Sequence, residues 1–373
     1  MTTVSKKAVI PTCLQTLMDR SGQGPNVLVI RLGAMGDILR TLPAVRKLRR
    51  AIPGATIHWA CDDRWAQVLE DHPDLDGLLP LPRRRLDANR SSPSGWIRSA
   101  GLIREYSRQI RAVRFDLVLD FHGNFRSAVV GMFSGAKIRI GYGGHQQKEG
   151  NRLFTTLRVP PGHRRCSRMS RNLSLIAPLG IQQEPIPGGG LPHNPELDAE
   201  AGDLVRTALG PVERYAVINP GVSAGQSYKK PPPELLAAAA KRLQESAIGA
   251  LVTHGPGEIR DAEQVEALSG GAGKVAPPTS LPLLFHLIRN SLIFIGGDTG
   301  PLHVACAVGT PVLGIYGPTD PAVNAPWNVP CETVFPMGRT YTGIKKIDRK
   351  SGGFHGLTAT MVVEGLERLL AAL

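Results

Sequence analysis

Short apolar runs alternate with amphipathic helical patterns along nearly the whole of this 373-residue chain. Runs such as Val27–Ile30, Phe115–Phe121 and Tyr215–Ile218 are typical of parallel strands, which are covered on both faces. Between such runs, patterns like Ile38–Leu48 place apolar residues on one face of a helix. Repeated strand–helix–strand units predict an α/β fold with parallel sheets.

One segment interrupts this alternation. Residues 181–195 are rich in proline and glycine, with three consecutive glycines at Gly188–Gly190, which is typical of a linker. A chain of 373 residues is long enough for about two domains of roughly 150 residues each. We therefore predict an N-terminal extension over 1–25, a first domain over 26–185, a linker over 186–195, a second domain over 196–355, and a C-terminal helix over 356–373 that could pack back on the first domain.

The same patterns give the expected elements in order along the chain. Strands are expected at 27–30, 55–61, 77–81, 115–121, 137–142, 215–218, 249–253, 292–295 and 312–316. Helices are expected from 37 onward and at 63–72, 96–113, 233–245, 258–269, 281–289, 301–308 and 358–370.

The charge of the chain is strongly basic. Lys and Arg number 44 against 31 Asp and Glu, a net charge of +13, and the arginine clusters concentrate in the N-terminal half. Arg104, Arg108 and Arg111 share one face of the helix expected over 96–113. Such a surface attracts anions. Nucleic acid is disfavoured as the partner, because aromatic residues are only 5% and do not interleave with the basic clusters.

The cysteines and the absence of long apolar stretches bear on the compartment. Five widely spaced cysteines form no CxxC pair, which argues against a disulfide framework and favours a reducing compartment. No apolar run approaches the ~18 residues that a membrane span needs. The N-terminus lacks the pattern of a signal peptide. We expect a cytoplasmic protein.

A glycine-rich turn, Arg31–Asp37 (RLGAMGD), follows the first strand. Its two glycines allow a close backbone approach to a ligand, but the spacing is not that of a GxGxxG dinucleotide fingerprint. Asp37 is open to two interpretations. It caps the following helix, or it points toward a ligand as a general base.

A second glycine-rich turn precedes the helix at 301–308. Asp298, Thr299 and Gly300 lie where free N–H groups and the helix dipole favour a phosphate, and Asp298 could bind sugar hydroxyls. A simple turn with a helix cap is the alternative. Lys229 and Lys230 follow another strand, where they could bind phosphate or form ordinary solvated surface.

Other motifs lose their support from context. Gly221–Gly225 spells GxSxG, but the prolines Pro231–Pro233 leave no helix directly after the serine, as a hydrolase elbow requires. Asp74 and Asp76 spell DxD before a strand rather than after one, and we interpret them as a turn. Neither HExxH nor a Walker motif occurs.

Four segments together resemble glycosyltransferase family 9, the ADP-heptose:lipopolysaccharide heptosyltransferases. They are RLGAMGDILRTLPAVRKLRRAIPGA (31–55), FDLVLDFHGNFRSAVV (115–130), INPGVSAGQSYKKPPPELL (218–236) and GGDTGPLHVACAVGTPVLGIYGPTDP (296–321). The resemblance implies a GT-B fold, with an acceptor-binding and a nucleotide-sugar-binding Rossmann-like domain facing across a cleft. It also implies inverting, metal-independent transfer of heptose to the inner core of lipopolysaccharide, without a cofactor.

The resemblance also implies roles for particular residues. Asp37 matches the catalytic base. The residues that match donor and phosphate binding are Lys229, Ser223, Asp298, Thr299, Gly300 and Glu258, and those placed for acceptor binding are Gly36, His122, Asn124 and Arg126. The implied partners are a nucleotide-sugar, an anionic glycolipid and the inner membrane surface, with no bound metal. A transferase with another donor or a protein acceptor, and a non-catalytic glycolipid-binding protein, remain the alternatives.

Overall fold

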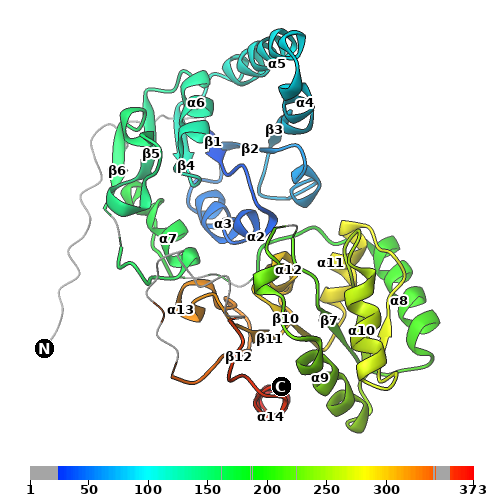
Figure 1. The fold of residues 1–373 in the computed structure, drawn as a ribbon. Coiled ribbons are helices and arrows are strands. Elements are labelled where there is room, and N and C mark those ends of the chain that lie inside the picture. Colours follow the sequence, from blue (N-terminus) through cyan, green and yellow to red (C-terminus); the bar gives the residue numbers. More distant parts are fainter. Residues whose placement is uncertain are drawn as a thin grey trace, which may run out of the picture. The chain divides into compact units, whose positions relative to one another are not determined.

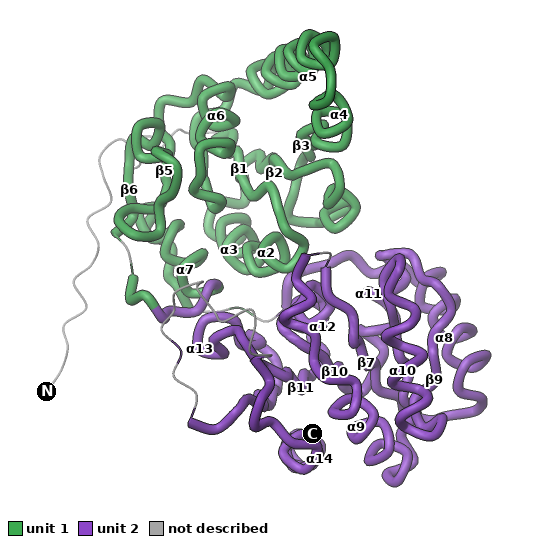
Figure 2. The backbone as a smooth tube through the Cα atoms, in the orientation of Figure 1, with its two compact units in different colours: residues 1–164, 169–186 green, residues 165–168, 187–373 purple. Residues whose placement is uncertain are grey.

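The chain folds into two compact units, each built around one sheet (Figure 1). The computed structural model describes residues 24–160, 162–184, 186, 188–223, 225–338, 341 and 353–373. Unit 1 comprises residues 1–164 and 169–186, and unit 2 comprises residues 165–168 and 187–373 (Figure 2). Most of the expected N-terminal extension, residues 1–23, lies outside the described residues.

Unit 1 contains a six-stranded parallel sheet in the order β3-β2-β1-β4-β5-β6. Its strands are β1 (Asn26–Ile30), β2 (Thr56–Asp62), β3 (Gly77–Leu81), β4 (Leu117–Asp120), β5 (Ile138–Tyr142) and β6 (Leu157–Val159). Its helices are α2 (Met35–Leu39), α3 (Leu42–Ala51), α4 (Arg83–Ala88), α5 (Pro93–Ala112), α6 (Phe125–Phe133) and α7 (Arg168–Ser174), the last beginning in the short stretch assigned to unit 2.

Unit 2 repeats this architecture with a second parallel sheet, in the order β12-β11-β10-β7-β8-β9. Its strands are β7 (Tyr215–Asn219), β8 (Gly249–Val252), β9 (Gly273–Val275), β10 (Ile293–Gly297), β11 (Val312–Ile315) and β12 (Cys331–Val334). Its helices are α8 (Pro195–Leu209), α9 (Pro233–Glu245), α10 (Ile259–Leu268), α11 (Leu281–Arg289), α12 (Gly300–Val308), α13 (Pro321–Asn324) and α14 (Ala359–Ala371).

The central strands are buried along their length, as their continuous apolar runs predict. Val27–Ile30 in β1 and Ile293–Ile295 in β10 are fully buried, because helices cover both faces of each sheet. These two strands lie in the middle of their sheets. The doubly wound α/β architecture expected from the sequence is therefore confirmed.

The prediction of a helix over residues 63–72 is wrong. This segment contains only a 3-10 turn, Ala66–Val68, and Asp71 adopts a left-handed backbone conformation with φ 55°. The cause lies at the end of β2, where the Asp62 carboxylate accepts the backbone N–H of Arg64 at 3.1 Å. Such local side-chain bonding competes with the start of a helix.

The C-terminal helix packs within unit 2, so the expectation that it packs back on the first domain is wrong. Helix α14 lies against α9, β11 and β12. Its face of Val362, Leu366 and Leu369 is buried in the core of that unit. Full burial of each such side chain contributes about 1.5–3 kcal/mol, which fixes the helix where its apolar face finds partners.

None of the described helices is long and apolar enough to cross a lipid bilayer.

Candidate active site

In both units the candidate residues gather where the strand order reverses. In unit 1, β1 pairs with β2 on one side and β4 on the other, and in unit 2, β7 pairs with β8 and β10. Loops leaving the carboxyl ends of such neighbouring strands diverge and leave a crevice, where open parallel sheets bind ligands. Asp37 and His122 follow β1 and β4, and Lys229 and Asp298 follow β7 and β10.

The Asp37 carboxylate is held between two arginines. It forms one ion pair with Arg31 and a second with Arg40, at 3.2 Å, and its side chain is 21% exposed. The peptide oxygen of Asp37 accepts the Thr41 hydroxyl at 2.8 Å, and the Gly36 oxygen accepts Nε of Arg40 at 3.1 Å. Asp37 lies in the first turn of α2 but does not cap it, because the N-cap position is Ala34 and no side chain bonds there. The carboxylate is fixed in orientation and still accessible.

Arg31 links the β1 turn to the β4 turn, because its guanidinium donates to the Phe121 carbonyl. His122 is next in the chain, and its Nδ1 is buried with no hydrogen-bond partner among the described residues. Burial, followed by the charge of Arg31, lowers the pKa of His122 to about 3, while the Asp37 charge opposes this shift. His122 is therefore a neutral imidazole beside an arginine–carboxylate pair.

Asp120, at the end of β4, holds this turn together. Its buried carboxylate accepts the backbone N–H groups of His122 and Gly123, both at 2.9 Å, and the side chains of Ser127 and Asn151. Burial raises the pKa of Asp120 despite these four donors. The network fixes the loop that carries His122.

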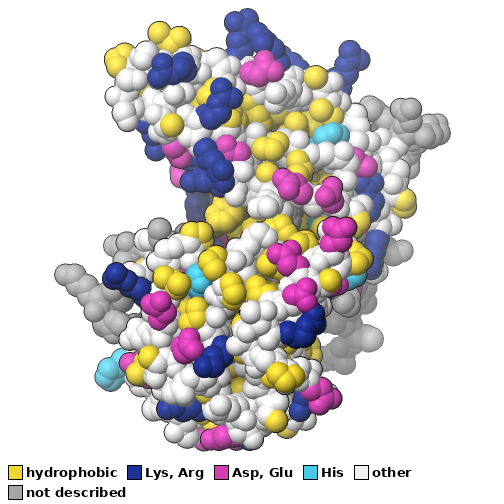
Figure 3. Space-filling view, turned by 90° about the vertical axis from the view of Figure 1, so that its right-hand side faces the viewer, with side chains coloured by type: hydrophobic (Ala, Val, Ile, Leu, Met, Phe, Trp, Pro, Cys, Tyr) yellow, Lys and Arg dark blue, Asp and Glu magenta, His cyan; other side chains and the backbone are white. Residues whose placement is uncertain are grey.

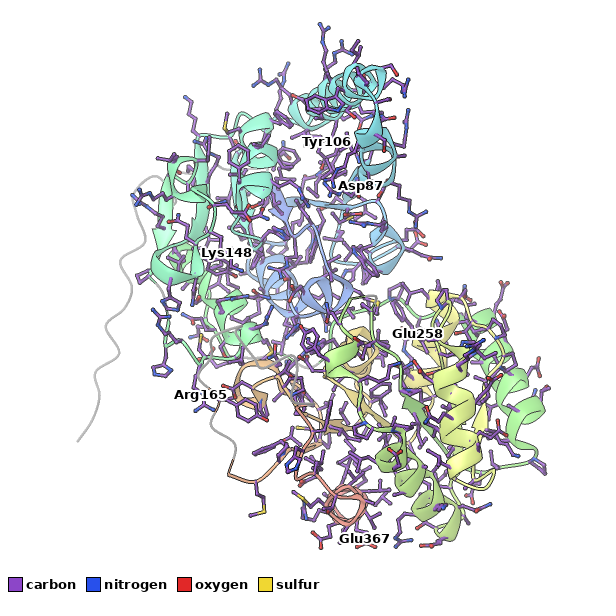
Figure 4. All side chains as sticks on the ribbon, viewed as in Figure 1. Asp87, Tyr106, Lys148, Arg165, Glu258 and Glu367 are labelled. Carbon is purple, nitrogen blue, oxygen red and sulfur yellow. The ribbon has the colours of Figure 1, made fainter. Side chains whose placement is uncertain are left out.

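Asn124 and Arg126 open helix α6. Asn124 is its N-cap, with Oδ1 accepting the Ser127 N–H at 3.1 Å. Arg126 is exposed, and its pKa is lowered first by partial burial and then by the neighbouring charge of Arg83. Asp87 of α4, labelled in Figure 4, balances part of this basic cluster through its ion pair with Arg83 at 3.0 Å.

The lowered pKa of His122 predicts a pH dependence of stability. A histidine in the unfolded chain has a pKa near 6.5. Below that pH, His122 therefore binds a proton in the unfolded chain but stays neutral in the folded one. Stability is therefore full above about pH 6.5 and falls as the pH drops toward about 3. We expect a loss on the order of 1–2 kcal/mol at pH 5. Urea unfolding at pH 7.5 and 5.0 checks this, and His122→Gln should remove that part of the slope; an unchanged slope would contradict it.

In unit 2, Lys229 and Asp298 form a shielded ion pair. Nζ of Lys229 lies 3.1 Å from a carboxylate oxygen of Asp298, and the two side chains are 18% and 4% exposed. Nε2 of His303 lies 3.5 Å from the other carboxylate oxygen, and its ring is almost fully buried. Asp298 thus fixes the direction of the Lys229 ammonium, which remains partly accessible.

Thr299 and Gly300 form the start of α12, whose N-cap is Thr299. The Thr299 side chain does not cap the helix; its hydroxyl lies 3.4 Å from the Gly297 oxygen. Helix N-terminal N–H groups and the helix dipole attract anions. The ion pair with Asp298 holds the Lys229 ammonium beside this turn. This end of the sheet is therefore suited to a phosphate group.

Glu258 lies against the loop after β7 because that loop carries glycine. A Cβ on Gly221 would come 2.1 Å from Oε2 of Glu258, so only glycine leaves room for the carboxylate. The same oxygen accepts the Gly255 N–H at 3.0 Å. Figure 4 shows Glu258 at the start of α10. Ser223, in the β7 loop, is exposed.

Sequence reasoning missed the residues that orient these groups. Arg31 and Arg40 clamp Asp37, and Lys230 pairs with Asp261 at 2.7 Å, whereas its neighbour Lys229 pairs with Asp298. The one available signal is Arg31, a charged residue directly after a fully buried strand. Among the described residues, no group of three or more His, Cys, Asp or Glu side chains could hold a metal ion.

Two doubly wound units with candidate ligand-binding residues after their central strands are the architecture of the GT-B fold. The family model of "Glycosyltransferase family 9 (heptosyltransferase)" matches residues 103–341. The chain belongs to this family, and it is a glycosyltransferase.

Individual relatives agree with this assignment. The chain is 26% identical over 308 residues to lipopolysaccharide heptosyltransferase 3 of Escherichia coli K12, covering 78% of this chain and 82% of the relative. It is 26% identical over 299 residues to lipopolysaccharide heptosyltransferase 1 of Pseudomonas aeruginosa PAO1, covering 79% of each. The structure of E. coli heptosyltransferase WaaC with ADP-2-deoxy-2-fluoro heptose superposes with a TM-score of 0.69 at 21% identity, covering 92% of this chain and 99% of WaaC. The last likeness concerns the fold.

Proposed function

We propose that this enzyme transfers heptose from ADP-heptose to the inner core of lipopolysaccharide, with inversion at the anomeric carbon and without a metal ion. Membership of the heptosyltransferase family supports the sugar. The names of its relatives support the lipopolysaccharide acceptor, and WaaC, which binds an ADP-heptose analogue, supports the donor. The observation that carries the mechanism is the accessible Asp37 carboxylate, clamped by two arginines at the β1–β4 switch point.

Asp37 is the proposed base. Its carboxylate removes the proton of the acceptor hydroxyl while that oxygen bonds to the anomeric carbon, and the bond from that carbon to the ADP oxygen breaks. Attack from the face opposite the leaving group inverts the configuration. A carboxylate paired with two arginines is a weak base, so orientation of the acceptor contributes a large share of the rate.

Lys229 and the start of α12 are the proposed partners of the leaving diphosphate. The Lys229 ammonium and the N–H groups after Thr299 stabilise the negative charge that grows on ADP as its bond to the sugar breaks. Asp298 positions that ammonium, and Glu258 and Ser223 contact the nucleoside part of the donor. These groups do the work that a metal ion performs in other transferases.

The acceptor is proposed to be an anionic glycolipid. The proposed acceptor residues are Gly36, next to Asp37 in α2, and His122, Asn124 and Arg126, which follow β4. The neutral His122 can accept or donate a hydrogen bond to a sugar hydroxyl. We place the enzyme in the cytoplasm. The buried Cys61, which forms no disulfide, suits a reducing compartment.

Turnover with a core acceptor tests this function. Purified protein, ADP-heptose and a truncated inner-core acceptor should release ADP only when the acceptor is present, at the same rate with and without EDTA. The one-bond carbon–hydrogen coupling of the new anomeric centre should show the configuration opposite to that of the donor. Loss of activity in EDTA would contradict metal independence, and a retained configuration would contradict inversion.

The close approach of Gly221 to Glu258 gives a separate prediction for donor binding. In Gly221→Ala the new methyl group displaces the Glu258 carboxylate, which is the end of a flexible side chain and can move without unfolding the loop. We expect the KM for ADP-heptose to rise about tenfold, with kcat and thermal stability little changed. Gly225→Ala is a poor control because its φ is 78°, whereas Gly202→Ala on α8 has ordinary backbone geometry. An unchanged KM would remove Glu258 from the donor site.

A further inference from the structure

Helix α5 of unit 1 carries an outward face that the packing of the unit does not use. Its buried side is formed by Gly95, Tyr106 and Ile110. At 100° per residue, Ile97, Arg104, Arg108 and Arg111 cluster on the side opposite to these residues, and Trp96 flanks them. We call Trp96, Ile97, Arg104, Arg108 and Arg111 the α5 outer face. Figure 1 shows α5 at the rim of unit 1, next to α4 and α6.

The N-terminal end of the α5 outer face is apolar and exposed. Trp96 is 71% exposed and Ile97 is 77% exposed. Ile103, nearly two turns further along, is 41% exposed. Adjacent large apolar side chains with this much exposure to water mark an interaction surface more often than single exposed apolar side chains do. At a membrane surface, tryptophan is enriched at the boundary between lipid headgroups and acyl chains, and an apolar neighbour such as isoleucine can insert there with it.

The remainder of this surface is basic. Residues 83–114 contain nine arginines against two acidic residues, Asp87 and Glu105, so this stretch carries +7 of the net +13 of the chain. Arg108 pairs with Glu105 at 3.0 Å, whereas Arg104 and Arg111 form no ion pair within the described residues. Figure 3 keeps the vertical axis of Figure 1, and at its top, where α4 and α5 lie, basic side chains stand beside apolar ones.

We propose that the α5 outer face docks on an anionic lipid bilayer, with Trp96 and Ile97 inserted at the headgroup boundary and the arginines against lipid phosphates. Charge complementarity selects an anionic partner. The apolar tip selects a bilayer over nucleic acid, because a lone tryptophan next to an isoleucine offers no row of stacking platforms for bases. The long arginine side chains let the helix lie in the interface while their charges remain at the headgroups.

This inference builds on the proposed glycolipid acceptor, because an enzyme docked on the bilayer meets a lipid-anchored acceptor by diffusion in two dimensions. The two can fail separately. Binding to vesicles needs neither donor nor acceptor, and turnover can be measured on a truncated acceptor that carries no lipid.

Sedimentation of the full chain with vesicles tests the proposal. We expect the protein to bind vesicles of phosphatidylethanolamine and phosphatidylglycerol (3:1) and not vesicles of pure phosphatidylcholine. Reversal of three charges in Arg104→Glu/Arg108→Glu/Arg111→Glu should weaken binding about tenfold or more. Trp96→Ala/Ile97→Ala should weaken binding about tenfold. The binding that remains is electrostatic and should disappear at 0.5 M salt, where the Debye length falls to about 4–5 Å and the attraction between arginines and lipid phosphates is screened.

Matched controls separate location from net charge. Arg50→Glu/Arg158→Glu/Arg214→Glu changes the net charge equally at exposed arginines elsewhere, and Met337→Ala removes an 86% exposed apolar side chain. Both controls should bind vesicles much as the parent does, and all variants should keep turnover on the truncated acceptor. Equal loss in both triple variants would overturn the proposal, as would wild-type vesicle binding by Trp96→Ala/Ile97→Ala. Tighter binding to a single-stranded oligonucleotide than to the anionic vesicles would overturn it too.

Discussion

Replacing Asp37 by Asn should lower kcat for heptose transfer by about 10²–10⁴-fold, the contribution of a positioned general base. Asparagine keeps the shape of the side chain but cannot take up the acceptor proton. The KM for ADP-heptose should change little, because Asp37 belongs to unit 1 and the proposed donor residues belong to unit 2. Steady-state release of ADP, with circular dichroism to establish folding, measures both quantities.

A second carboxylate of the same unit provides the control for Asp37. Asp74 pairs with Arg46 at 3.3 Å and its side chain is 17% exposed, against 21% for Asp37. It precedes β3, whereas ligand-binding loops follow strands, so Asp74→Asn should keep turnover close to that of the parent. If folded Asp37→Asn also kept its turnover, Asp37 would not be the base.

Replacing Lys229 by Met is expected to lower kcat/KM by about 10²–10³-fold, because the departing diphosphate loses its cationic partner. The same change leaves the Asp298 carboxylate buried without its lysine. Removing one member of a buried pair costs about 3–5 kcal/mol of stability. A loss of activity in this variant alone therefore combines two effects.

The double variant Lys229→Met/Asp298→Asn separates them. It removes both charges, so thermal stability should recover toward that of the parent while turnover stays low. Lys230→Met is the matched control, since its partner Asp261 is more exposed than Asp298 and the pair lies outside the proposed phosphate site. Recovery of turnover together with stability in the double variant would show that Lys229 is structural.

The sequence alone predicts the α/β architecture well, because strands buried on both faces require continuous apolar runs such as Val27–Ile30. Two expectations fail where tertiary contacts decide the outcome. The helix expected over 63–72 is prevented by the bond between Asp62 and the Arg64 backbone. The apolar face of α14 is plain from its periodicity, but the surface it covers depends on the arrangement of β11, β12 and α9.

The candidate site divides in the same way. The turns that carry Asp37 and Asp298 are recognisable because glycine-rich turns after buried strands are local patterns. The choice of ion-pair partner is not local. Asp298 binds Lys229, 69 residues away, whereas the adjacent Lys230 binds Asp261. No local pattern distinguishes these two lysines, and only the family resemblance singles out Lys229.

The preference of the enzyme among donors tests the central claim, heptose transfer from ADP-heptose, most directly. The full chain is incubated with a truncated inner-core acceptor and, in parallel, with ADP-heptose, ADP-hexose, GDP-hexose and UDP-hexose, and the released diphosphate is measured by chromatography. We predict acceptor-dependent release of ADP from ADP-heptose, far faster than release of any diphosphate from the hexose donors. Equal or faster turnover of a hexose donor, or no acceptor-dependent release from ADP-heptose, would contradict the account.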